Sequence, residues 1–449
     1  MINKKETQYE KMIETSIPKL ITSLALPTVL SQLITTIYNT ADTYFVAQIG
    51  TSATAAVGVV FSLMSIIQAV GFGLGMGSNS LISRNLGARN DKAANIYGNS
   101  AFVAAIIFGL FLMVFGLLGI QPLMRILGST ETMLPYSCSY GRYILIGAPV
   151  MCSSFVLNNI LRSEGHALYA MWGLCTGGIL NMILDPLFIF GFDMGISGAA
   201  LATILSQIAS FIILLSIFIR NKSIVKLSLK YISRNSGDYF LIMKTGFPTI
   251  CRQMLGSVSS ALLNIQAAFY GDAAVGAITI ANKIYMFVRN IILGIGQGFQ
   301  PVAGYNYGAK NKKRVKEAFI FVCTAGTVIC TVSALLIGFN ALSVISWFRK
   351  DDMEVIQIGT ATLYFACAVM PMMAYSTYVN QMYQCLGFSR QATFLASLRQ
   401  GICFVPLVLI LPQIIELAGV QVSQPAADLL TFIISLPFQI KFFKNRLKD

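Results

Sequence analysis

The chain has few charged side chains: 11% of its 449 residues are Asp, Glu, Lys or Arg, against roughly 25% in an average soluble domain. Its one histidine, His166, excludes a histidine-based metal centre. The nine cysteines are an odd number scattered through apolar runs, which argues against a disulfide framework and a zinc site. Without a Gly-Lys dipeptide, no Walker A loop can form. Apolar residues instead make up 55% of the chain, with a mean hydropathy of +0.70, so most of it is expected in lipid.

Long apolar runs predict an all-α membrane protein with twelve transmembrane helices, because one span needs about 20 residues. The runs do not alternate apolar and polar residues, as the strands of a membrane barrel would. The last span is the least clear, because Pro425 and Asp428 lie at its start. The expected spans are residues 17–46, 54–80, 93–118, 134–160, 167–190, 196–219, 239–262, 273–301, 317–339, 355–384, 392–415 and 425–441.

An internal repeat runs through the chain: the segment Gly73–Asn90 returns 221 residues later as Gly294–Asn311. The same shift aligns Pro27 with Pro248. Because the repeated glycines lie inside apolar runs, we interpret them as points of close helix approach or bending, not as a phosphate loop. The shared positions are Gly73/Gly294, Gly75/Gly296, Gly77/Gly298, Asn85/Asn306, Gly87/Gly308, Ala88/Ala309 and Asn90/Asn311.

The repeat predicts two six-helix bundles: an N-terminal lobe at residues 1–220 and a C-terminal lobe at residues 239–449. A basic cytoplasmic linker at residues 221–238 would join them. Because six is an even number, both halves enter the membrane in the same direction, and a pseudo-two-fold axis along the membrane normal should relate them. Two such lobes can rock against each other around a site between them.

The net charge of +14 is distributed unevenly among the predicted loops. Most of the 32 lysines and arginines fall on one side of the membrane, including the runs Arg220–Arg234 and Lys310–Lys316. This asymmetry predicts a multi-pass protein of the cell membrane whose N- and C-termini are cytoplasmic. The basic loops are expected to lie on anionic lipid. No nucleic-acid recognition motif accompanies the charge, so a nucleic-acid partner is not expected.

Polar residues at steps of four and three follow one face of the first span. They end at Asp42, and a carboxylate at the centre of a bilayer costs about 2.5–3.5 kcal/mol on insertion scales. Such a stripe must face protein or a water-filled cavity. The alternative is that Asp42 lies at the outer end of the span and is only hydrated. The stripe consists of Thr28, Gln32, Thr35, Asn39 and Asp42.

The fifth span carries a second polar group, Asn181 and Asp185, four residues apart and followed by Pro186. Pro186 cannot donate a hydrogen bond, so it frees a carbonyl in the same turn. Thr203 in the sixth span could join this group and Asp42 in one polar nest. Two close carboxylates could share a proton, or a sodium ion could neutralise both, and the sequence leaves that choice open. The alternative for Asp185 is a residue at a helix end beside an outer loop.

The second half lacks these acids: Leu263 aligns with Asp42, and residues 239–262 and 361–384 contain no Asp or Glu. It offers methionines and tyrosines around Pro371, which suit varied apolar or cationic guests but also occur in ordinary cores. It also carries cations at or near span depth, namely Arg252, Lys283, Arg289 and Arg399. The methionines and tyrosines are Met370, Met372, Met373, Tyr375, Tyr378, Met382 and Tyr383.

The two six-helix halves, with Pro27 and Asp42 in the first span, Asn181-x-x-x-Asp185 in the fifth and Leu-Arg-Ser-Glu-Gly at 161–165, resemble the multidrug and toxic compound extrusion (MATE) family. The resemblance covers essentially the whole chain. The composition of the chain is similar to that of the MepA-like branch of bacterial drug exporters. The family is known for exporting cationic, amphipathic compounds against a proton or sodium gradient.

The resemblance implies a cation site, for a proton or Na+, at Asp42, Asn181, Asp185 and Thr203. It also implies that the first helix bends at Pro27 during transport. Some relatives carry acids in helices 7 and 10, which this chain lacks, so a second ion site in the C-terminal lobe is in doubt. The expected substrate-binding residues are Gln32, Thr35, Tyr38, Asn39, Tyr140, Asn158, Met373, Tyr375 and Tyr378.

The sequence thus predicts a secondary antiporter, not an enzyme, that exports cationic drugs or dyes by alternating access in exchange for H+ or Na+. No cofactor besides the coupling ion, and no obligatory protein partner, is expected. One rival is a flippase of lipid-linked precursors, which would need a strongly cationic central cavity. Another is an intramembrane enzyme, against which the absence of His-Glu-x-x-His and Gly-x-Gly-Asp patterns argues. A sensor or scaffold would not need an acid in the first span.

Overall fold

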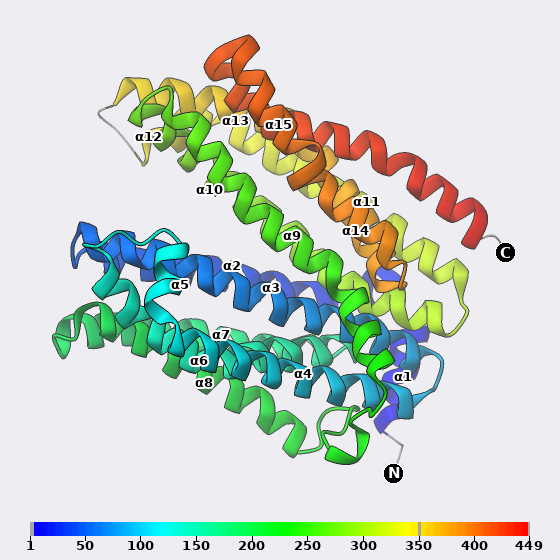
Figure 1. Ribbon diagram of the computed structural model, residues 1–449. Helices are drawn as coiled ribbons and strands as arrows, with labels where there is room; N and C mark the ends of the chain where they lie inside the picture. The colour runs from blue at the N-terminus through cyan, green and yellow to red at the C-terminus, as the bar shows by residue number, and fades with distance from the viewer. Residues whose placement is uncertain (1–3, 349–351, 448–449) are drawn as a thin grey trace.

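The computed structural model describes residues 4–348 and 352–447, and this part of the chain contains helices and no strand. Residues 1–3, 349–351 and 448–449, which belong to the two expected lobes, lie outside the described residues. Figure 1 shows two groups of long helices: the first half of the chain, blue to green, lies below the second half, brighter green to red. The predicted two-lobed helical architecture is confirmed.

Among the described residues, ten helices are long and apolar enough to cross a membrane. Each lobe contributes six helical segments at the expected spans. Those of the N-terminal lobe are α2 (Ile17–Ala47), α3 (Thr51–Gly87), α4 (Asp91–Leu118), α6 (Leu134–Ser163), α7 (Ala167–Pro186) with the π-helical turn η1 (Leu187–Gly191), and α8 (Gly195–Ile219). Those of the C-terminal lobe are α9 (Ser236–Ala268), α10 (Asp272–Gly308), α11 (Lys312–Phe339), α13 (Met353–Cys385), and α14 (Ser389–Ser397), which continues through η3 (Leu398–Ile402) into α15 (Phe404–Arg446).

The helix α15 contains the end of the eleventh span and the whole of the twelfth. It breaks at Ile415 and at Glu416, whose φ of 50° is left-handed, and there the chain turns back (Figure 1). Gly419 lies against the backbone of Leu411 across this turn. The twelfth span therefore begins earlier than predicted and continues through Pro425 as helix.

Most of the repeated glycines form crossing points between the two lobes, whereas Gly75 and Gly296 contact helices of their own lobe. A methyl group on Gly87 would lie 2.1 Å from the carbonyl oxygen of Tyr305, and one on Gly308 would lie 2.0 Å from that of Arg84. These two contacts are equivalent under the 221-residue shift. Because no side chain fits at such distances, only glycine permits the crossing of α3 and α10.

The repeat also makes the contact of α3 with α9 equivalent to the contact of α10 with α2. A methyl group on Gly77 would lie 2.1 Å from the carbonyl oxygen of Ile242, and one on Gly298 would lie 2.6 Å from the amide nitrogen of Ala25. The interpretation of the glycines as points of close approach is therefore confirmed. We call the end of the molecule that holds Gly87 and Gly308 the closed end. Toward the other end, the helices of the two lobes diverge (Figure 1).

A short helix that the sequence did not reveal, α1 (Lys4–Glu14), joins the two lobes at the closed end. Gln8 Nε2 donates to the carbonyl oxygen of Glu164 in the N-terminal lobe at 2.9 Å. From the C-terminal lobe, Arg314 Nη2 donates to the carbonyl oxygen of Thr15, just beyond α1, at 2.6 Å. Two more short helices, α5 (Ile120–Ile126) and α12 (Ala341–Ser346), occupy equivalent places in the two lobes.

The linker between the lobes is attached to the N-terminal lobe by hydrogen bonds. The Glu164 carboxylate accepts from Ser223 Oγ at 2.6 Å and from the backbone N–H groups of Ile224 and Val225 at 3.0 and 2.8 Å. Asn99, on α4, accepts from the Ser228 N–H at 2.8 Å. A single 3-10 turn, η2 (Leu229–Tyr231), follows before α9 begins.

Candidate functional site

The polar stripe of α2 lies between the C-terminal lobe and α7. Thr28 Oγ1 donates to the Gly294 carbonyl oxygen of α10 at 2.6 Å. Tyr38 instead packs on α7, where a methyl group on Gly178 would lie 2.9 Å from its ring. At roughly 100° per residue, Asp42 points midway between these two directions. Its electrostatic neighbours Tyr140 and Asp185 belong to α6 and α7, so the acid is directed into the N-terminal lobe.

Asp42 and Asp185 are both buried, with 5% and 0% of their surface exposed, and they interact electrostatically with each other. Asp42 Oδ1 and Asp185 Oδ2 have no hydrogen-bond partner among the described residues. Neither acid forms an ion pair within the described part of the chain. The alternative in which Asp42 is hydrated at the rim does not agree with this burial.

Three further polar residues surround the acids. Asn181 Nδ2 donates to Asp185 Oδ1 at 3.0 Å. Tyr140, fully buried on α6, interacts electrostatically with both acids, and its hydroxyl is directed toward the side chain of Thr203. Thr203, on α8, lies beside Tyr140 and donates to the Ala199 carbonyl oxygen at 3.0 Å. We call Asp42, Tyr140, Asn181, Asp185 and Thr203 the acidic nest.

The acidic nest is rich in oxygen acceptors and contains no cationic side chain. Buried polar atoms normally have partners, and a buried carboxylate is strongly destabilised unless a positive charge accompanies it. The described residues contain no group of three His, Cys, Asp or Glu that could hold a metal ion. Two carboxylates with hydroxyl and amide oxygens instead suit a proton or a small monovalent cation.

Among the expected substrate residues of the N-terminal lobe, Gln32, Thr35, Tyr38 and Asn39 are partly exposed along α2. Thr35 Oγ1 donates to the carbonyl oxygen of Ser31 at 2.8 Å. Pro27 is buried, and α2 runs through it as one helix. A bend at Pro27 therefore remains a prediction, since the helix is unbroken in this conformation.

Asn158 lies far from the acidic nest. Its side chain is buried and donates to the Ala170 carbonyl oxygen of α7 at 2.8 Å. Ala170 precedes Asp185 by four turns of α7, which corresponds to about 22 Å along the helix. In this conformation, Asn158 therefore joins α6 to α7 near the closed end.

The expected substrate residues of the C-terminal lobe are packed within that lobe. Met373 and Tyr378 are fully buried, and a methyl group on Gly326 of α11 would lie 2.5 Å from the Tyr378 ring. Tyr375 donates from its hydroxyl to Gln439 Oε1 at 3.0 Å. A substrate role for these residues would require them to become accessible in another conformation.

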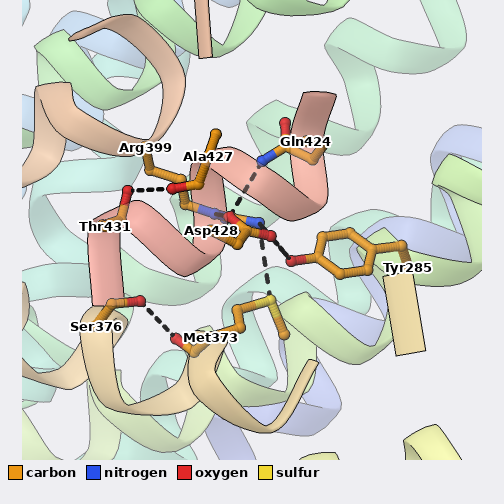
Figure 2. Close-up of polar contacts among 8 residues, drawn as sticks. All are labelled: Tyr285, Met373, Ser376, Arg399, Gln424, Ala427, Asp428 and Thr431. Atoms are coloured by element: carbon orange, nitrogen blue, oxygen red, sulfur yellow. Dashed lines mark hydrogen bonds and ion pairs between the residues drawn. The ribbon is translucent and has the colours of Figure 1, made fainter. Parts of the chain in front are cut away.

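The C-terminal lobe contains a charged network that sequence reasoning missed (Figure 2). Arg399 Nε lies 2.5 Å from Asp428 Oδ1, and Tyr285 donates to Asp428 Oδ2. Gln424 Nε2 donates to Asp428 Oδ1 at 3.1 Å, and Arg399 Nη2 approaches the sulfur of Met373 at 3.8 Å. Asp428 had been interpreted as the start of a span. In the sequence, the four-residue spacing of Gln424 and Asp428 could have indicated a buried polar face on this helix.

A protein-family model described as MatE matches residues 27–187 and 248–410, one segment in each lobe. Multidrug export protein MepA from Staphylococcus saprophyticus is 25% identical over 417 residues, which cover 93% of this chain and 92% of that protein. Multidrug export protein MepA from Staphylococcus aureus strain MRSA252 is 27% identical over 406 residues, covering 90% and 89%. Both similarities therefore extend through the two lobes.

A solved structure, described as the outward-facing conformation of a multidrug resistance MATE family transporter of the MOP superfamily, has the same fold. It superimposes with a TM-score of 0.91 at 25% identity and covers 99% of each chain. The similarity therefore includes the arrangement of the two lobes as well as the helices within them.

Proposed function

The chain belongs to the MatE family of transporters, and from this membership we propose that it exports amphipathic organic cations by exchange with H+ or Na+. Its relatives MepA are multidrug export proteins, which supports a broad range of small-molecule substrates. The members of this family are transporters, and we assign no enzymatic step to the chain.

One observation carries the ion-coupling part of the proposal: the buried carboxylates of Asp42 and Asp185 interact electrostatically, and neither has an ion-pair partner among the described residues. An unpaired buried carboxylate needs a proton or a cation. Binding and release of that ion would change the electrostatic free energy of the α2–α7 interface. The nest can therefore couple an ion gradient to the conformation of α2.

We place the closed end at the cytoplasmic face of a cell membrane, with both termini on that side. Arg84, Arg89, Lys310 and the basic linker all lie at this end, as the distribution of positive charge in membrane proteins favours. This orientation makes the described conformation outward-facing, and the similarity to an outward-facing relative supports it.

In the proposed cycle, an ion enters the acidic nest from the outside and neutralises the acids. α2 then changes its packing against α7, with Pro27 as the expected hinge, and the hold on a cationic substrate weakens. At the cytoplasmic side the ion leaves and a new substrate binds. Ion and substrate must bind the two conformations unequally, because a ligand with equal affinity for both shifts no equilibrium.

The test is transport of a fluorescent organic cation such as ethidium in proteoliposomes, driven separately by a pH gradient and by a Na+ gradient. Asp42→Asn and Asp185→Asn should each reduce gradient-driven transport at least tenfold. The matched control is Asp193→Asn, because Asp193 is an exposed acid just beyond η1. Wild-type transport by both nest variants would refute ion coupling through the nest. The gradient that drives transport identifies the ion.

A flippase of lipid-linked precursors is the second candidate, because the C-terminal lobe contains several membrane-embedded arginines. Those arginines line pockets bounded by helices of one lobe, whereas a flippase of this fold would need a cationic chamber between the lobes. A flipping assay with a lipid-linked pyrophosphate in the same vesicles separates the two functions. The antiporter proposal expects no flipping above that of empty vesicles.

A further inference from the structure

The C-terminal lobe contains a basic pocket with about 440 Å³ of empty space, part of which is open to the outside of the protein. Arg252 from α9, Arg289 from α10 and Arg399 from η3 all line it. A second pocket, of about 420 Å³, shares Arg289 and Arg399 with the first. We call the first of these the arginine pocket.

Only one of the three guanidinium groups has a carboxylate partner. Arg399 is paired with Asp428, whose second oxygen accepts from Tyr285. Arg252 and Arg289 are half-buried and make no hydrogen bond or ion pair with any described residue. They also interact electrostatically with each other. The arginine pocket therefore has an excess of two positive charges.

Like charges at membrane depth repel one another through a medium of low dielectric constant. An anion between Arg252 and Arg289 would remove this repulsion, and a guanidinium binds a carboxylate through two parallel hydrogen bonds. The remaining lining is mixed: Ser376, Thr377 and Asn380 offer polar groups, and apolar side chains such as Leu293 and Leu395 cover other parts. Such a lining suits an organic molecule with an acidic end.

We propose that the arginine pocket binds the carboxylate of an amphipathic organic anion through Arg252 and Arg289. Arg399 acts as a positioning residue, because Asp428 already neutralises it and its contacts with Tyr285 fix the wall of the pocket. The site lies within one lobe and is separate from the acidic nest. Its occupancy does not depend on which ion drives transport.

Equilibrium binding to the purified full-length protein in detergent tests this proposal. Isothermal titration compares 2-naphthoate with 2-naphthamide, which has nearly the same shape but no charge. Wild-type protein should bind the carboxylate at least tenfold more tightly than the amide. Equal affinities for the two probes in the wild-type protein would overturn the proposal, whatever any variant does.

Substitutions then locate the binding. Arg252→Gln and Arg289→Gln should each reduce the preference for naphthoate at least fivefold, and Arg289→Lys should restore part of it because it keeps the charge. Lys283→Gln is the matched control: Lys283 is an exposed cation on the same helix as Arg289 and lines none of the described pockets. A loss of preference in the Lys283 variant equal to that in the arginine variants would contradict the assignment.

A third arm distinguishes an organic anion from an inorganic one. Titration with inorganic phosphate alone should give an affinity at least tenfold weaker than that for naphthoate, because phosphate makes no use of the apolar lining. Phosphate binding that is as tight as naphthoate binding would refute the organic ligand. Transport failure without loss of naphthoate binding would count against the proposed antiport and leave this site supported, so the two proposals fail separately.

Discussion

The two lobes have equivalent helices and opposite interiors. The N-terminal lobe buries Asp42 and Asp185 without a cation, whereas the described part of the C-terminal lobe buries a single acid, Asp428, against Arg399. In the first lobe, the proposed function has the positive charge arrive as a ligand. In the second it is already part of the protein, with more arginine than acid to neutralise it. If both proposals hold, the two lobes bind ligands of opposite charge.

The comparison also shows what the repeat retains. Its shared residues are those that hold helices together: Asn158 donates to the Ala170 carbonyl oxygen, and Asn380 donates to that of Ala392. These pairs are related by a shift of 222, one more than the shift in the first helices of each half. Packing contacts of this kind recur in both lobes, whereas the charged and polar side chains in the interior differ between the lobes. The fold thus separates the scaffold, which is duplicated, from the chemistry, which is not.

The largest difference in stability between equivalent changes in the two lobes should appear when one buried acid of each lobe is replaced by asparagine. Asp428→Asn leaves Arg399 buried without its carboxylate, which typically costs about 3–5 kcal/mol of folding free energy. Asp42→Asn removes a buried charge that has no partner, so it should leave stability unchanged or raise it. Thermal unfolding of both variants in one detergent, at a pH where the nest is ion-free, measures the difference.

A double variant serves as the control for this contrast. Arg399→Met combined with Asp428→Leu replaces the ion pair by apolar groups of similar volume, which is often neutral or stabilising. It should recover most of the stability that Asp428→Asn loses. If Asp428→Asn proves as stable as Asp42→Asn, the distinction between a paired and an unpaired acid is wrong.

The crossing of the lobes should be the next most sensitive feature. Gly308→Ala would place a methyl group 2.0 Å from the Arg84 carbonyl oxygen, and such overpacking costs up to about 3 kcal/mol. Gly87→Ala should have a similar effect, because it makes the equivalent contact. Gly276→Ala, on the same helix as Gly308 but with no atom within 4 Å, should stabilise α10 by about 0.5–1 kcal/mol. Melting temperatures of the three variants test the symmetry of the closed end.

Much of this architecture could be predicted from the sequence, because lipid imposes a strong pattern. Apolar length locates the spans, and the repeated glycines locate the crossings. The short helix α1 and the attachment of the linker to Glu164 could not be predicted. Both depend on contacts between segments that are distant in the chain, and neither has a periodic apolar face that a sequence would show. The early start of the last span was missed because a proline usually marks the beginning of a helix. Pro425 instead lies buried inside α15, which continues through it.

The site was predicted unevenly for the same physical reason. Asp42, Asn181 and Asp185 were identified because acids and amides are rare in apolar runs. Tyr140 was placed near them by family resemblance alone, because a tyrosine on an apolar helix carries no signal of its own. The network around Asp428 was missed because only three-dimensional packing brings Tyr285 and Arg399 to it (Figure 2).

A smaller difference between the lobes concerns the linker. Glu164 accepts hydrogen bonds from Ser223, Ile224 and Val225, and the equivalent position in the C-terminal lobe is the buried Leu386. In Glu164→Gln, an amide NH2 group would replace one of the accepting oxygens and face a donor. The free energy of unfolding should fall by about 1.5 kcal/mol. Amide hydrogen exchange at residues 223–225 should accelerate. The control Glu10→Gln, at an exposed position of α1, should leave that exchange unchanged.

The smallest difference between the lobes is expected at two equivalent asparagines, whose substitution should cost the same in each lobe. Asn158→Ala removes the hydrogen bond to the Ala170 carbonyl oxygen, at 2.8 Å, and Asn380→Ala removes the one to Ala392, at 2.7 Å. Both asparagines are buried, with 1% and 6% of their surface exposed, so each substitution should cost about 1–3 kcal/mol by leaving a buried carbonyl without that donor. Thermal unfolding of the two single variants gives the comparison. Because both bonds belong to the duplicated scaffold, a selective loss of transport in Asn158→Ala at matched stability would show that Asn158 contacts substrate or ion in another conformation.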